Sequence, residues 1–140
     1  MREILFRGKL KAENGEFQKG EWVYGDFVTL IDGKEKHPHI YGKGEVKAET
    51  IGQFTGLTDK NGTKIFDGDI VEGHCHSQWR HCLQRCVVVY DRDSFKSRHY
   101  LNFPNEKHYF EYKVLFSKDV VVIGNIHDNP ELLESKVQGE

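Results

Sequence analysis

Six potential zinc ligands fall within thirteen residues near the middle of the chain. They are His74, Cys75, His76, His81, Cys82 and Cys86. Imidazole and thiolate groups are common zinc ligands, so this segment suggests a zinc site. The spacing counts against one, because the segment has no Cys-x-x-Cys pair and a strand would turn His74 and His76 away from Cys75. We therefore predict a polar hairpin that binds no structural zinc.

The closeness of cysteine and histidine also suggests a nucleophile with its base. A catalytic pair needs in addition a group that orients the base and a site for the oxyanion, and the sequence identifies neither. Cys86 precedes Val87-Val88-Val89, which favours a small thiol buried in a strand. We predict no catalytic residue and no enzyme, and a Cys/His hydrolase is the third of three functional hypotheses.

Four carboxylates close together could in principle bind a divalent cation. They are Asp59, Asp67, Asp69 and Glu72. Their spacing differs from the EF-hand loop, which places its ligands at alternate positions and closes with a glutamate. Asp59-Lys60-Asn61-Gly62 and Asp67-Gly68-Asp69 are typical of tight turns, in which an aspartate side chain bonds to the backbone ahead. We predict turns here, with no metal and no cofactor.

Residues 74 to 108 carry six cationic side chains against three carboxylates, a local surplus of three. Aromatic residues are interleaved with them, and such a surface could hold single-stranded nucleic acid through phosphate contacts and stacking. An ordinary solvated sheet face, with its rings turned to the core, accounts for the same pattern. The candidate nucleic-acid contacts are Arg80, Arg85, Arg92, Lys96 and Arg98.

The elements that would position these residues are organised around residues 50 to 72. There, turn signals separate short apolar groups, which predicts strands joined by tight turns with Gly62 and Gly68 at positive φ. The spacing of Ile51, Phe54 and Leu57 by three predicts a 3₁₀ turn. Beyond it, we predict a hairpin over residues 70 to 90 with its tip near 77 to 81. Further strands are predicted at 4–6, 21–31 with a bend at Gly25, 37–41 as an edge strand, and 120–124, with a short helix from Asn129-Pro130.

The organising stretch resembles the signature of the YopX family, small proteins of bacteriophages, prophages and related mobile elements. The resemblance lies in residues 51–57, 59–62 and 65–71, and extends to an opening at 6–9 and 20–26 and a close at 122–133. It implies a β-rich fold with a small SH3-like barrel. It implies no activity and no site residues, because the family has no established biochemical function. Residues 73 to 85, rich in His, Cys and Arg, depart from the family pattern.

We therefore predict a mainly β fold that forms a single YopX-like domain over residues 1–140. Its SH3-like barrel is expected near residues 50–90, with added N- and C-terminal strands and a short C-terminal helix. The low hydrophobic content of 37% is offset by 12% aromatic residues, which can fill such a core. The residues expected to be buried in one shared core are Phe54, Leu57, Ile65, Ile70, Val88 and Ile123.

The first functional hypothesis is a non-enzymatic accessory protein of a phage or mobile element that binds an unknown protein partner or forms a homo-oligomer. The second is a nucleic-acid-binding module that uses residues 74–108. The net charge of −2 gives the whole chain no general attraction to nucleic acid or to anionic membranes. No apolar run is long enough for a transmembrane helix, the N-terminus does not resemble a secretory signal, and three cysteines form no disulfide framework. We expect a protein of the host cytoplasm.

Overall fold

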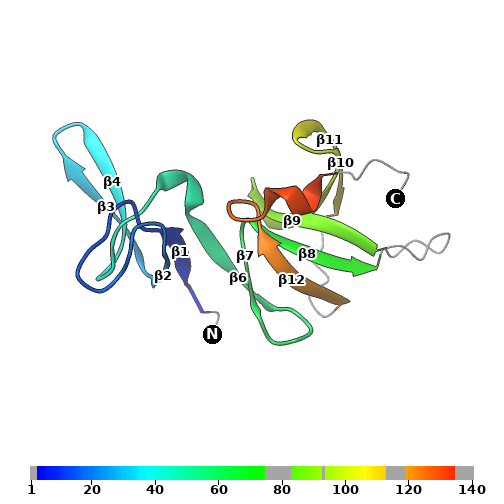
Figure 1. Cartoon of the computed structure of the whole chain (residues 1–140), viewed down its shortest axis with the longest axis horizontal. Coiled ribbons are helices and arrows are strands. Elements are labelled where there is room, and N and C mark those ends of the chain that lie inside the picture. Colours follow the sequence, from blue (N-terminus) through cyan, green and yellow to red (C-terminus); the bar gives the residue numbers. More distant parts are fainter. Residues whose placement is uncertain (1–2, 75–82, 93, 113–118, 135–140) are drawn as a thin grey trace. The chain divides into compact units, whose positions relative to one another are not determined.

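The computed structural model describes residues 3–74, 83–92, 94–112 and 119–134. These residues form twelve strands and two 3₁₀ turns, which confirms the mainly β prediction (Figure 1). The strands are β1 (Phe6–Lys9), β2 (Trp22–Gly25), β3 (Phe27–Asp32), β4 (Glu35–Ile40), β5 (Gly44–Glu45), β6 (Gly52–Thr58), β7 (Lys64–Phe66), β8 (Asp69–His74), β9 (Leu83–Asp91), β10 (Ser94–Asn102), β11 (Asn105–Tyr112) and β12 (Val120–Asn125). The 3₁₀ turns are η1 (Ala48–Thr50) and η3 (Pro130–Leu133).

The chain divides into two compact units, Met1–Gly56 and Leu57–Glu140. The strands pair in the orders β2-β1-β6-β7, β3-β4-β5 and β11-β10-β9-β8-β12. The predicted barrel is wrong for the described strands, because β11 and β12 end the longest sheet without pairing with each other. Residues 50–90 instead contribute to two separate sheets. The single domain over residues 1–140 stays a prediction, since a division into compact units does not test whether they fold together.

The first unit has a small core formed by Leu10, Val23, Ile40 and Val46. The strand predicted over residues 21–31 is split at Asp26, so that β2 and β3 enter different sheets, and Gly25 with φ of 156° provides the predicted bend. A two-residue loop follows Asp32, because Asp32 pairs with Glu35 across residues 33 and 34 and Gly33 has φ of 63°. The prediction that residues 37–41 form an edge strand is wrong, because β4, which contains residues 37–40, lies between β3 and β5.

The second unit is an antiparallel sheet with a separate apolar cluster on each face. Neighbouring Val87 and Val88 point to opposite faces, so the apolar run in β9 is buried on both sides. One cluster holds Ile65, Val71, Cys86 and Val88, and the other Ile70, Val87, Tyr100 and Leu133 with Ile123 packed against it. The prediction of one shared core is therefore wrong, although most of its members are buried or partly buried.

Leu57 is the exposed exception among the predicted core residues, with 41% of its surface accessible. The predicted 3₁₀ turn lies instead at Ala48–Thr50, and the following residues form β6. An apolar spacing of three that suits a 3₁₀ turn does not keep one face of a strand apolar, because strand side chains alternate. Phe54 is buried in β6, and Leu57 is not.

Asp59 ties the turn after β6 to the distant strand β12. Its Oδ1 accepts hydrogen bonds from the amides of Asn61 (2.8 Å) and Thr63 (2.9 Å), as the turn predicted. Its Oδ2 accepts one from the amide of Val122 (2.9 Å), which the sequence did not indicate. The side chain is 4% exposed. Burial of the carboxyl raises its pKa, but the donating amides, that of Val122 first, outweigh burial and leave the pKa below its usual value.

The glycines of both predicted turns have positive φ, 86° at Gly62 and 95° at Gly68, which confirms the turn assignments. In the second turn, Asp69 Oδ2 accepts a hydrogen bond from the amide of Phe66 (2.7 Å). The predicted C-terminal helix is the 3₁₀ turn η3, which begins at Pro130 as expected. Asn129 does not cap it through its side chain.

Replacing Asp59 with asparagine should destabilise the chain by about 1–3 kcal/mol at pH 7, because an amide nitrogen would face the donor of Val122. The folded-state pKa of Asp59 lies below the unfolded value of about 3.9. The ionised carboxylate therefore stabilises the fold above that pH, and this stability is lost as the pH falls through the folded-state pKa. Urea unfolding at several pH values between 7 and 3 should show a flatter acid dependence in Asp59→Asn. Glu106→Gln, at an exposed carboxylate, is the control. If Asp59→Asn were as stable as the wild-type chain, the stabilising role of the Asp59 carboxylate would be contradicted.

Replacing Gly62 with valine should destabilise the chain by about 1 kcal/mol or more, because a branched residue is strained at positive φ. A Cβ added at Gly62 would meet no other atom within 4 Å, so a clash at Cβ does not contribute. Gly15 has equally open surroundings without positive φ, so Gly15→Val is the matched control. Thermal unfolding of the two variants would separate backbone strain from the effect of valine itself, and equal melting temperatures would refute the strain.

Candidate interaction surface

The cluster of histidines and cysteines lies mostly outside the described residues. Cys75, His76, His81 and Cys82 belong to the segment that joins β8 and β9, and His74, which pairs with Leu83, is the last described residue before it. Cys86 pairs with Val71 inside an apolar cluster, which confirms its predicted place in the core. Burial raises the pKa of its thiol to about 11. Among the described residues no three His, Cys, Asp or Glu side chains gather where a metal ion could bind.

Three of the predicted nucleic-acid contacts lie on one face of the second unit's sheet and are paired with carboxylates. Arg85 Nε donates to Glu72 (2.8 Å), which is directly opposite on β8. Arg98 donates to Glu111 (2.7 Å) and to Asp91 (2.9 Å). The sequence predicted a strand for Arg85 but none for the segment that carries Lys96 and Arg98, and it revealed no carboxylate partner for any of the three.

These pairings reduce the charge that the face presents. Burial lowers the pKa of Arg98, but hydrogen bonds to Glu111 and Tyr100 outweigh it and raise the pKa above the usual value. Lys96 Nζ lies 4.0 Å from Asp91, and its side chain is only 13% exposed. Arg92 is exposed in the turn after β9, and Arg80 lies outside the described residues. The predicted contacts therefore do not form one open cationic surface in the described part of the chain.

The most exposed apolar strand of the described structure is β3. All six of its residues are exposed, including Val28, Leu30 (53%) and Ile31 (69%). Leu30 pairs with His37 and Ile31 with Lys36, so apolar side chains are exposed on both faces of the β3–β4 hairpin. The sequence predicted this strand but gave no sign that it is exposed, since an apolar run looks the same in a core.

The outer edge of β3 offers backbone groups for a further strand. The amide of Tyr41 donates to the carbonyl of Asp26 (2.8 Å), which fixes the alternation of the β3–β4 ladder. By that alternation, the backbone groups of Phe27, Thr29 and Ile31 point away from β4. In the described residues, β3 has no neighbour on that side.

Other strands at sheet edges carry features that hinder pairing, and residues 27–31 of β3 carry none. In β12, the carbonyl of Val120 accepts from the amide of Lys60 (3.1 Å) and the amide of Val122 donates to Asp59, and the strand has an irregular register. Strand β11 carries charged residues at 106, 107 and 111, and β2 is four residues long. Residues 27–31 contain no charge, proline or bulge. Such devices are how proteins protect edges from pairing.

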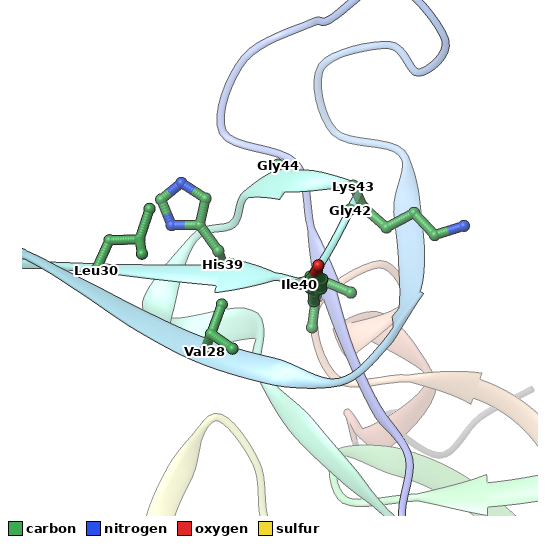
Figure 2. A pocket seen from close by; sticks show the side chains of 8 residues that line it. Val28, Leu30, His39, Ile40, Gly42, Lys43 and Gly44 are labelled. Carbon is green, nitrogen blue, oxygen red and sulfur yellow. The ribbon is translucent and has the colours of Figure 1, made fainter.

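A shallow hollow of about 510 Å³ adjoins β3 on one face of the hairpin. Figure 2 shows Val28, Leu30 and His39 pointing to the same side, while the ammonium of Lys43 points away. The lining residues are Val28, Leu30, His39, Ile40, Tyr41, Gly42, Lys43 and Gly44. The hollow is therefore mainly apolar, and it suits side chains better than a charged ligand.

The polar groups of β4 are engaged with neighbours in the hairpin. His37 Nδ1 lies 3.2 Å from Glu45 and Nε2 lies 3.6 Å from Glu35. The hydrogen bond with His37 is the main cause that lowers the pKa of Glu45, with Lys11 adding to it against the effect of burial. His39 Nδ1 contacts the carbonyl of His37 at 3.0 Å. The contact between His37 and Glu45 joins β4 to β5, on the side of β4 away from β3.

The fold and this surface describe a mainly β protein with an unprotected sheet edge. The family model described as YopX protein matches residues 8–134, and the chain belongs to that family. Among solved structures, one titled as the crystal structure of protein EF1440 from Enterococcus faecalis is 29% identical. That match covers 78% of this chain and 76% of the other, with a TM-score of 0.42. No curated protein matches. None of the helices in the described residues has the length and apolar character needed to cross a bilayer.

Cys86 should be unreactive in the folded chain, because at pH 8 a thiol with a pKa of about 11 is ionised in only about one molecule in a thousand. The test uses the double variant Cys75→Ser, Cys82→Ser, which leaves Cys86 as the only thiol. A chromogenic disulfide reagent should label it slowly until denaturant is added, and then within minutes. Rapid labelling without denaturant would contradict the buried position and reopen the hydrolase hypothesis.

Proposed function

We propose that this YopX-family protein is an accessory protein of a phage or mobile element that acts by binding a protein partner or itself, without catalysis. The observation that carries the proposal is the exposed apolar edge of β3, at Phe27 to Ile31. An exposed apolar edge strand exposes the chain to aggregation unless a partner covers it. The risk of aggregation that this edge brings is best explained if the edge binds a partner.

The absence of catalysis is supported by the state of the candidate groups. The one described cysteine, Cys86, is buried and un-ionised at neutral pH. Asp59 and Asp69 accept hydrogen bonds from backbone amides, which accounts for their carboxylates without a substrate. A buried free thiol also suits the reducing host cytoplasm, which we propose as the location. Nucleic-acid binding by Arg85, Lys96 and Arg98 gains no support, since each lies beside a carboxylate.

The edge of β3 can be blocked at Thr29, whose amide points away from β4. Thr29→Pro removes that donor and leaves the ladder with β4 intact, and Thr29→Ala is the matched control that keeps the donor. Tagged wild-type and Thr29→Ala chains should recover the same partner from infected or induced host cells, or the same oligomer when purified. Thr29→Pro should lose it while its circular dichroism spectrum is unchanged. A partner or oligomer that Thr29→Pro retains would overturn the proposal.

A further inference from the structure

We propose that the occupant of the β3 edge is an extended segment of another protein, with about five apolar residues bounded at each end by lysine or arginine. This inference rests on the proposed function and names the chemistry of its partner. The addition of a strand to an exposed edge is a known mode of peptide recognition, in which backbone bonds give affinity and side chains give specificity. The edge determines the length of the segment, its apolar character and its charge.

The length follows from the backbone groups of the edge. Phe27, Thr29 and Ile31 each direct an amide and a carbonyl outward, which spans five residues of a facing strand. The ladder with β4 has no register shift over this range, so a straight partner strand can pair along all of it. A longer segment would meet Asp26 and Asp32 at the two ends.

The apolar character follows from both faces of β3. An added strand places alternate side chains beside Phe27 and Ile31 on one face and beside Val28 and Leu30 on the other. All four of these residues are exposed, so both sets of partner side chains would cover apolar surface. The hollow beside Val28 and Leu30 has room for a large side chain (Figure 2). Large apolar residues next to the centre of the partner segment are therefore favoured.

The charge follows from the two aspartates that flank the apolar run. In an antiparallel partner centred on Thr29, the third residue on either side of the centre lies opposite Asp26 or Asp32. Lysine or arginine there forms favourable cross-strand pairs. A second copy of β3 in this register would place Asp26 opposite Asp32 twice, and like charges across a strand pair are unfavourable. The edge thus favours a basic partner over a copy of itself.

The test uses a blocked heptapeptide with valine, tyrosine, threonine, tyrosine and valine between two lysines. A matched peptide carries glutamate in place of both lysines. Both sequences are palindromic, so each peptide presents the same order of side chains whether it pairs with β3 in the parallel or the antiparallel direction. Titration of the purified full-length chain, by fluorescence anisotropy of the labelled peptides at low salt, should show the lysine peptide binding at least about fivefold more tightly. The double variant Asp26→Asn, Asp32→Asn should remove most of that difference, and Thr29→Pro should abolish binding of both peptides.

Two results would overturn the inference while leaving the proposed function in place. In the first, the two peptides bind equally well or neither binds, while Thr29→Pro still loses the partner recovered from host cells. The other is a dimer of the purified chain, seen by sedimentation, that Thr29→Pro dissolves, which would make a second copy the occupant. If Thr29→Pro changes neither peptide binding nor any cellular interaction, the proposed function fails together with the inference.

Discussion

The structure of the second unit depends on the buried carboxylate of Asp59. Its three backbone hydrogen bonds join a turn of five residues to Val122, 63 positions later in the chain. Strand β12 pairs with β8, and β8 with β9, so this junction fixes one border of the sheet that separates the two apolar clusters. A carboxylate with this many donors is stabilised in its ionised form, which explains how a charge can be buried here without a cation.

The two units differ in how their sheet edges are protected, and Asp59 is part of this difference. The Asp59 turn occupies backbone groups of β12 that would otherwise be open, while β11 is protected by its charges. In the first unit, the apolar residues 27–31 of β3 have neither protection. An edge covered at such a specific junction in one unit and left open in the other shows no general lack of protection, which supports our proposal that the open edge serves binding.

The sequence predicted those features that depend on a few adjacent residues. The turns at Gly62 and Gly68 and the hairpin of β8 and β9 require only local turn chemistry and an apolar run, and they lie where expected. Features set by distant pairing could not be predicted. Nothing near Asp59 indicates that Val122 is its third donor, and the bend predicted at Gly25 does not by itself indicate that the strand divides between two sheets. The exposure of β3 is also a non-local property, because it depends on whether another strand of the described chain pairs with its outer edge.

Charge patterns show why composition alone misjudges a binding surface. Arg85 and Arg98 contribute to the local basic surplus counted along the sequence, yet the strand register places Glu72 and Glu111 directly opposite them. Phosphate binding would require these arginines to exchange a hydrogen-bonded carboxylate for a phosphate oxygen, so little is gained. The charges around β3 are arranged differently. Asp26 and Asp32 flank an uncharged run, and the strand itself contains no cation that could pair with them. A net charge of −2 for the chain conceals both arrangements. In our proposal, the charge that selects a partner is the charge at an accessible sheet edge, and only the pairing of the strands reveals which charges lie there.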